Sequence, residues 1–128
     1  MRAVDTNVLV RLFTRDDERQ VAAADAFIER GAWVSHLVLA EMVWVLGSSY
    51  HRDHSDIANT VDMLLRHKSL VVEDEDVVVA ALEQYRSRPS LGFTDCLVLE
   101  IARKAGHVPL GTFDKELSKI DGAVRLGR

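Results

Sequence analysis

Cysteine, proline and long apolar runs are scarce in this chain of 128 residues. Cys96 is the single cysteine, so no disulfide can form within the chain, and we expect a reducing compartment such as the cytoplasm. Polar residues such as Ser35 and Glu41 interrupt the apolar runs, and none approaches the ~20 residues that cross a bilayer. The start, MRAVDTN, has an acid at position 5 and does not resemble a secretory signal. These absences exclude disulfide-stabilised and membrane-spanning classes.

Apolar residues make up 48% of the chain, which is enough for a hydrophobic core. The length suits one domain over residues 1–128, and no repeat or linker interrupts it. The net charge of −4 argues weakly against nucleic-acid binding, because proteins that bind phosphates are usually basic. If four acids surrounded metal ions, however, the remainder of the chain would be near neutral. Net charge therefore does not exclude a metal-dependent enzyme that acts on RNA or DNA.

Short apolar segments alternate with longer segments of helical periodicity. The pattern predicts strands at residues 2–5, 33–34, 70–72, 108–110 and 123–126. It predicts helices at residues 6–14, 16–30, 37–50, 55–68, 75–87 and 93–104, the fourth capped by Ser55. This alternation favours an α/β fold, a three-layer α/β/α sandwich with a central parallel sheet of four to five strands. Ligands of such folds gather at the carboxyl ends of the strands.

Four acids occupy unusual places in this pattern. Asp5 and Asp114 follow predicted strands, and Asp95 lies at the start of a predicted helix. Glu41 is the only charge in LVLAEMVWVLG, a helix that is apolar all round and therefore predicted to be buried. An ionised Glu there is costly unless something pairs with it. The positions predict four carboxylates pointing into one pocket.

Four like charges in one pocket need cations or must take up protons. Ligands that are all oxygen suit Mg²⁺ or Mn²⁺, and such ions commonly hold phosphate oxygens and activate water. The cluster therefore indicates metal-assisted hydrolysis of phosphodiester bonds. Taken singly, Asp5, Asp95 and Asp114 are better explained as caps or turn residues, and Glu41 could reach the surface or meet an arginine. Their joint pattern favours the metal site.

Four segments together resemble PIN-domain proteins, specifically the VapC-type toxins of bacterial toxin–antitoxin pairs. The segments are VDTNVLVRLF at 4–13, SHLVLAEMVWVL at 35–46, LGFTDCLVLEIARKAG at 91–106 and GTFDKELSKIDGAVRL at 111–126. The resemblance implies a ribonuclease that needs one or two Mg²⁺ or Mn²⁺ ions, with Asp5, Glu41, Asp95 and Asp114 as its acidic quartet. It also implies that Asn7 and Thr112 hold the acids in place by hydrogen bonds, as groups behind metal ligands do.

The same resemblance implies partners: an RNA substrate, a second copy in a homodimer, and a small antitoxin whose C-terminal segment lies in or near the active-site groove. Arg11 and Lys115 are candidate contacts for phosphate or antitoxin acids, and a role as solvated surface cations is equally open. Trp33 and Trp44 are interpreted as core or dimer interface, and Cys96 as core.

Two other functions compete with this one. In a haloacid-dehalogenase-type phosphatase the first strand is also followed by a nucleophilic Asp, but that chemistry needs a second acid two residues later, where this chain has Asn7. A binding module would hold a metal or partner without catalysis, and the complete acidic quartet argues against it.

Overall fold

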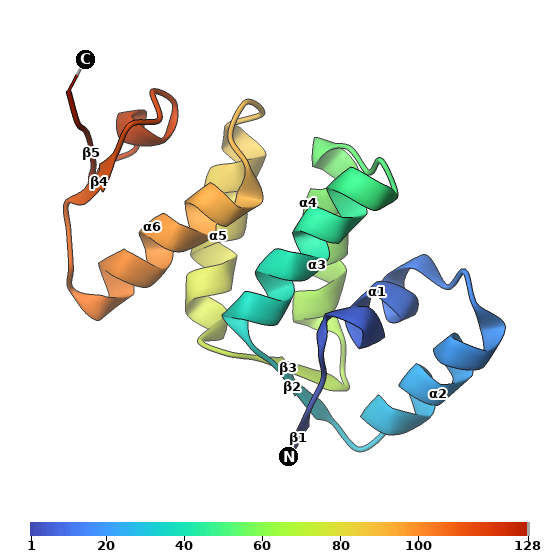
Figure 1. Cartoon of the computed structure of the whole chain (residues 1–128). Helices are drawn as coiled ribbons and strands as arrows, with labels where there is room; N and C mark the ends of the chain where they lie inside the picture. Colours follow the sequence, from blue (N-terminus) through green and yellow to red (C-terminus); the bar gives the residue numbers. More distant parts are fainter. Residues whose placement is uncertain (128) are drawn as a thin grey trace. The chain divides into compact units, whose positions relative to one another are not determined.

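The computed structural model describes residues 1–127 and consists of short parallel strands that alternate with helices (Figure 1). Contacts divide the chain into an N-terminal unit, Met1–Glu75, and a C-terminal unit that begins at Asp76. The predicted α/β class with parallel strands is confirmed. The strands pair as one set of three and one set of two. Within residues 1–127, no helix is long and apolar enough to cross a membrane.

A three-stranded parallel sheet organises the N-terminal unit, in the order β1 (Arg2–Ala3), β2 (Ala32–Val34) and β3 (Leu70–Val72). Its helices are α1 (Thr6–Thr14), α2 (Glu18–Ile28), α3 (His36–Ser49) and α4 (His54–Arg66). Alternate residues of a strand face opposite sides. Val34 of β2 is therefore fully buried, whereas Trp33 beside it is 38% exposed. The core also includes Leu9, Leu39, Met42, Leu46, Val61 and Leu64.

The C-terminal unit contains two helices, a parallel strand pair and a 3₁₀ turn among its described residues. The elements are α5, which begins one residue earlier (Glu75–Ser87), α6 (Phe93–Ala105), β4 (Leu110–Thr112), η1 (Leu117–Lys119) and β5 (Ala123–Arg125). Tyr85 and Phe93 pack edge to face with ring centroids 5.7 Å apart. Gly106 ends α6 in the left-handed conformation (φ 83°), which glycine adopts without strain. β4 and β5 pair with Thr112 opposite Arg125.

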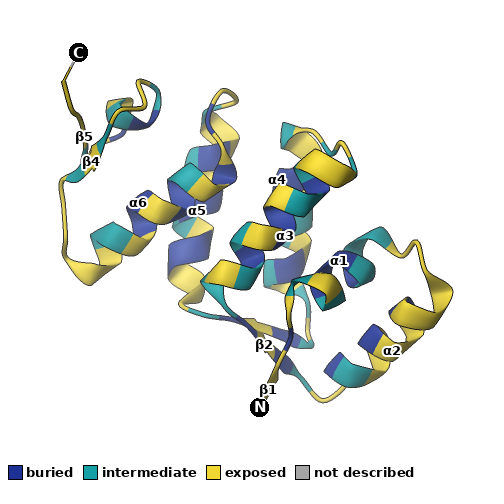
Figure 2. Cartoon of the chain, in the orientation of Figure 1, coloured by how far each residue is buried: buried dark blue, intermediate teal, exposed yellow. Residues whose placement is uncertain are grey.

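Three sequence predictions about the elements are wrong in detail. The strand predicted at residues 108–110 begins only at Leu110. The cap of α4 is Asp53 rather than Ser55, because Asp53 and Asp56 form a reciprocal capping box. Helix α3 is not buried all round, and Figure 2 shows exposed positions alternating with buried ones along it. Its exposed face includes Glu41, and both Leu37 and Trp44 are 70% exposed.

Candidate active site

Asp5 joins the end of β1 to the start of α1. Its Oδ1 accepts a hydrogen bond from the Val8 backbone N–H at 3.2 Å, so Asp5 is the N-cap of α1. The side chain is exposed, and its Oδ2 accepts no hydrogen bond from residues 1–127. The capping role that Asp5 favours when taken singly is therefore present. It uses one carboxylate oxygen and leaves the other available to a ligand.

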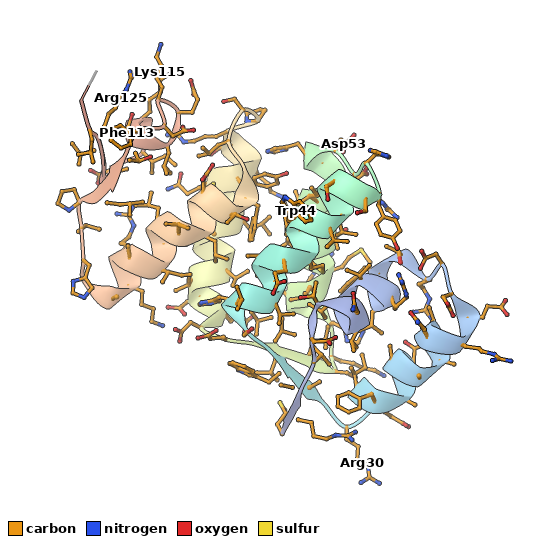
Figure 3. All side chains as sticks on the ribbon, viewed as in Figure 1. Arg30, Trp44, Asp53, Phe113, Lys115 and Arg125 are labelled. Carbon is orange, nitrogen blue, oxygen red and sulfur yellow. The ribbon has the colours of Figure 1, made fainter. Side chains whose placement is uncertain are left out.

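Glu41 lies on α3 and is exposed, which corrects the prediction of a buried charge. The prediction was wrong because the helix carries an exposed apolar stripe, with Leu37 one turn before Glu41 and Trp44 one turn after it. Figure 3 labels Trp44, whose side chain lies on α3. Of the two interpretations of Trp44, a core position is wrong, and a place in a dimer interface stays a prediction. Glu41 therefore needs no partner to be stable, and its carboxylate is open to solvent or a ligand.

The N-terminus of α3 is held by two oxygens from strand ends. The Ser35 Oγ accepts from the Val38 N–H at 3.1 Å, and the Glu73 Oε1 accepts from the His36 N–H at 2.9 Å. Ser35 follows β2 and Glu73 follows β3, so both lie at the carboxyl edge of the sheet, where Asp5 follows β1. The sequence analysis did not single out Glu73. An acid directly after the strand at 70–72 was the available signal.

A polar network ties α1 to the end of α3, two helices that pack against each other. The Arg11 Nη1 donates to the Tyr50 hydroxyl at 2.9 Å, and that hydroxyl donates to the Asp16 Oδ2 at 2.8 Å. The Tyr50 hydrogen bond raises the pKa of Arg11 and lowers the pKa of Asp16. Arg11 also contacts Gln20. The role of Arg11, for which the sequence left two interpretations, is therefore to link α1 to the end of α3 through Tyr50.

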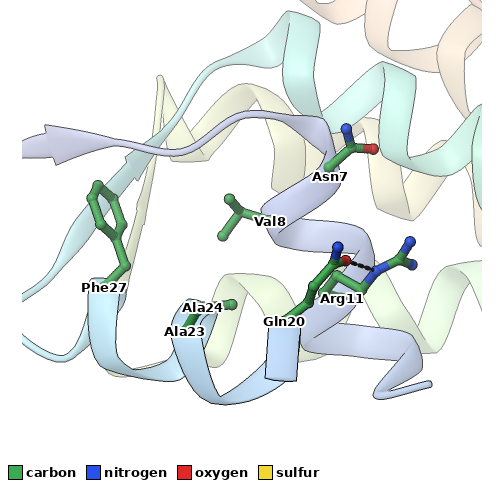
Figure 4. Close-up of a pocket in the computed structure, with 7 residues that line it drawn as sticks. All are labelled: Asn7, Val8, Arg11, Gln20, Ala23, Ala24 and Phe27. Atoms are coloured by element: carbon green, nitrogen blue, oxygen red, sulfur yellow. Dashed lines mark hydrogen bonds between the residues drawn. The ribbon is translucent and has the colours of Figure 1, made fainter. Parts of the chain in front are cut away.

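An apolar groove of about 340 Å³ lies between α1 and α2 (Figure 4). Its lining residues are Asn7, Val8, Arg11, Gln20, Ala23, Ala24 and Phe27. Asn7 is exposed, and its side chain hydrogen bonds to neither Asp5 nor Glu41. The groove therefore begins two residues after Asp5 and continues along the two helices to Phe27.

Asp95 and Asp114 form an acidic pair within the C-terminal unit. Asp95 lies in the first turn of α6, where the N-cap, Gly92, provides no side-chain hydrogen bond. Asp114 follows β4, and its Oδ1 accepts from the Leu117 N–H at 2.8 Å. Burial raises the pKa of Asp95, and the nearby charge of Asp114 raises it further. The two carboxylates therefore repel each other, and a cation between them would relieve that repulsion.

Thr112 and Arg103 hold the chain around Asp114. The Thr112 Oγ1 accepts from the Asp114 N–H at 3.0 Å. The Arg103 Nη2 donates to the Asp121 carbonyl at 2.6 Å, and its Nε donates to the Glu100 Oε1 at 3.1 Å. Glu100 is buried, with its Oε2 lacking a partner among residues 1–127. We call these contacts of Arg103 the Arg103 brace. The sequence analysis missed it, because the i, i+3 spacing of Glu100 and Arg103 is common on exposed helix faces.

Cys96, next to Asp95, is fully buried. Burial, with the charges of Asp95 and Glu100, raises the pKa of its thiol to about 11. A thiol with that pKa is protonated at neutral pH and is a poor nucleophile. The interpretation of Cys96 as a core residue is confirmed.

The four predicted acids thus fall into two pairs by unit: Asp5 and Glu41 in the first, Asp95 and Asp114 in the second. Among residues 1–127, no three His, Cys, Asp or Glu side chains form a group that could hold a metal ion. The donor chemistry of the second pair nevertheless suits Mg²⁺, which proteins often bind through one or two carboxylates while it keeps several waters.

Comparison with known proteins identifies one family. The family model described as PIN domain matches residues 2–123, almost the whole chain. Proteins of this family are generally nucleases that act on nucleic acids and use divalent metal ions. No curated protein and no solved structure gave a match to this chain.

Proposed function

This chain belongs to the PIN domain family, and from that premise we propose that it is a metal-dependent endoribonuclease toxin of the VapC type. It hydrolyses RNA phosphodiester bonds in the cytoplasm, inhibits translation and is neutralised by a cognate antitoxin. The observation that carries this proposal is the acidic pair of Asp95 and Asp114, in which burial raises the pKa of Asp95 and the charge of Asp114 raises it further. Carboxylates held close together at an energetic cost are typical of a site that binds cations.

Asp5, Glu41, Asp95 and Asp114 are the proposed ligands of one or two Mg²⁺ or Mn²⁺ ions. When bound, the metal supplies Lewis acidity for the phosphate and a more acidic water. Asp114 and Asp5 each use Oδ1 for a local hydrogen bond to the backbone, which orients the carboxylate and leaves Oδ2 for binding. Thr112 fixes the Asp114 backbone, and Asn7 is the proposed counterpart near Asp5.

The direct test is cleavage of RNA by the purified protein with Mn²⁺, with Mg²⁺ and with EDTA. We expect cleavage only with metal, and its loss in Asp5→Asn. The matched control is Asp17→Asn, because Asp17 caps α2 as Asp5 caps α1, with Oδ1 accepting from the Gln20 N–H at 3.0 Å. Equal loss in both variants would indicate an unspecific effect of removing a negative charge at a helix N-cap, because Asn keeps the capping oxygen. Full activity of Asp5→Asn in EDTA would overturn the proposal.

The proposed protein partners are a second copy and a small antitoxin. The apolar groove between α1 and α2 supports an antitoxin segment, because its lining begins at Asn7, two residues after Asp5. The exposed Leu37 and Trp44 on α3 offer further apolar surface. Expression in bacteria should be toxic, and a small protein encoded next to this one should restore growth. Toxicity that persists in Asp5→Asn would favour a non-catalytic binding module instead.

A phosphatase of the haloacid-dehalogenase type is the weaker alternative. The family match over residues 2–123 favours a nuclease, and Asn7 stands where that chemistry needs an acid. Incubation with a phosphate ester should leave no aspartyl phosphate on Asp5 by mass spectrometry. A stable phosphorylated Asp5 would reverse this choice.

A further inference from the structure

Phe113 is an aromatic side chain exposed at the proposed site. It follows β4 and lies between Thr112 and Asp114 in the chain, and 78% of its surface is exposed. Single exposed apolar residues are ordinary on protein surfaces. Phe113 differs from such residues because its neighbour along the chain is a proposed metal ligand. Phe113 is therefore an exposed ring one position along the chain from the proposed metal ligand.

Two cations accompany Phe113. Lys115 follows Asp114 directly, and Arg125 lies opposite Thr112 in the parallel pair of β4 and β5. The Leu126 N–H donates to the Thr112 carbonyl at 2.8 Å, which fixes the backbone next to Arg125. Figure 3 shows Phe113, Lys115 and Arg125 at the same end of the C-terminal unit. We call these three residues the β4 patch.

The cations of the β4 patch are available to a ligand. Lys115 and Arg125 are exposed, and neither forms an ion pair within residues 1–127. Nearby, Lys119 pairs with Glu116 at 3.1 Å, so the local acid that follows Lys115 already has a partner. The sequence of the C-terminal unit, residues 76–128, holds eight Lys and Arg against seven Asp and Glu, whereas residues 1–75 hold eight against thirteen. A polyanion therefore meets less repulsion at the C-terminal unit.

An exposed ring with one cation two positions along the chain and another on the paired strand matches the chemistry of unpaired nucleotides. Aromatic side chains stack on the faces of bases, and Lys and Arg contact the phosphates on either side. Bases within a duplex are stacked on each other and do not offer a free face. We propose that Phe113 stacks on an unpaired base of the bound RNA, with flanking phosphates at Lys115 and Arg125. This inference rests on the proposed ribonuclease function and adds the residues of the β4 patch as those that hold a nucleotide.

The test measures binding of a fluorescently labelled single-stranded RNA to the full chain in EDTA, where the proposed hydrolysis cannot proceed. Phe113→Ala should raise Kd about tenfold, the usual effect of losing one stacked base. Phe113→Leu is the matched control for apolar contact, because it keeps a large apolar side chain but has no ring. It should resemble Phe113→Ala, whereas Phe113→Trp should keep the affinity, and base stacking should quench its added fluorescence.

Salt dependence tests the cations. The affinity for RNA falls as salt rises, with a slope of log K against log salt of roughly −0.7 for each phosphate contacted on a single strand. Removing one of these cations, by Lys115→Gln or Arg125→Gln, should therefore reduce the magnitude of that slope by about 0.7. Lys119→Gln, which removes a paired cation, should change that slope less. A duplex of the same sequence should bind more weakly than the single strand and should be insensitive to Phe113→Ala.

Several outcomes would overturn the inference. Equal affinity of Phe113→Ala and the natural protein would do so, as would Phe113→Leu binding as tightly as Phe113→Trp. A change of oligomeric state in Phe113→Ala without a change in RNA affinity would assign the β4 patch to a protein contact. Because no metal is needed, binding through Phe113 without cleavage in Mn²⁺ would sustain the β4 patch and refute the ribonuclease proposal.

Discussion

The two units carry their acids in different electrostatic settings. In the N-terminal unit, Asp5 and Glu41 are exposed, and Asp5 caps a helix as an isolated carboxylate would. In the C-terminal unit, Asp95 is half-buried beside Asp114, and its pKa is raised by burial and by that neighbour. The two acids of the N-terminal unit therefore face solvent. In the C-terminal pair, burial and the charge of Asp114 both disfavour the ionised form of Asp95, so a bound cation would stabilise this pair.

The largest expected effect comes from removing a carboxylate of the C-terminal pair. Asp114→Asn keeps an oxygen that can accept from Leu117 N–H, but it removes the charge that would hold the metal. We expect RNA cleavage in Mn²⁺ to fall at least about a hundredfold, because metal catalysis contributes several kcal/mol and each 1.36 kcal/mol is a factor of ten. Asp121→Asn is the control, since Asp121 contributes its carbonyl to Arg103. Unchanged cleavage by Asp114→Asn would refute the assignment.

A smaller effect is expected from removing the contacts of Arg103, which hold the chain around Asp114 through the Asp121 carbonyl. Arg103→Gln removes the donor to the Asp121 carbonyl, and the Leu110 N–H bonds to the next carbonyl, that of Gly122, at 2.8 Å. We expect the Mn²⁺ dissociation constant to rise about tenfold, as for other groups that support metal ligands. Amide hydrogen exchange at Leu110 should also accelerate.

Lys104→Gln is the matched control for the Arg103 brace. It removes the same charge from the adjacent position of α6, where Lys104 contacts Asp76 of α5 at 2.9 Å rather than the β4–β5 region. Its Mn²⁺ affinity and the exchange rate at Leu110 should stay close to those of the natural protein. Equal effects in Arg103→Gln and Lys104→Gln would show that only net charge matters.

The pH dependence of stability provides a third comparison. The pKa of Asp95 is raised in the folded state, so its ionisation opposes folding at pH values above that pKa. Asp95→Asn should therefore raise Tm in metal-free buffer at pH 7. The gain should disappear as the pH falls through the raised pKa, because Asp95 itself becomes neutral there. Thermal unfolding between pH 3 and about pH 7.5 measures it, and a constant difference would contradict the repulsion.

The smallest effect concerns the N-terminal unit. Glu73→Ala removes the acceptor of the His36 N–H at the start of α3, and loss of such a cap costs about 1 kcal/mol. Urea unfolding should show a lower midpoint. Glu29→Ala serves as the control, because Glu29 is an exposed acid in the same unit at the C-terminal end of α2. A midpoint lowered as much by Glu29→Ala would show that the capping bond is unimportant.

Local sequence patterns predicted most element boundaries well. Residues 6–14, 70–72 and 75–87 match α1, β3 and α5, because apolar periodicity and glycine or proline breaks act within a few residues. The strand before Asp114 was misplaced because Val108 and Leu110 look equally strand-like, and only pairing with β5 shows where β4 begins. The burial of Glu41 was wrong for a similar reason. An apolar helix does not reveal which of its faces has a covering partner.

The sequence by itself determined the α/β class, the capping and strand-end positions of the acids, and a family pattern that the match to residues 2–123 shows as PIN domain. These depend on short-range spacing and on residue chemistry. Only the tertiary structure decided that Arg11 is engaged by Tyr50, that Glu73 accepts from the His36 N–H at the start of α3, and that the charge of Asp114 adds to burial in raising the pKa of Asp95. Each of these joins residues at least 19 positions apart, from 95 to 114 in the shortest case, and such contacts are set by how helices and strands pack.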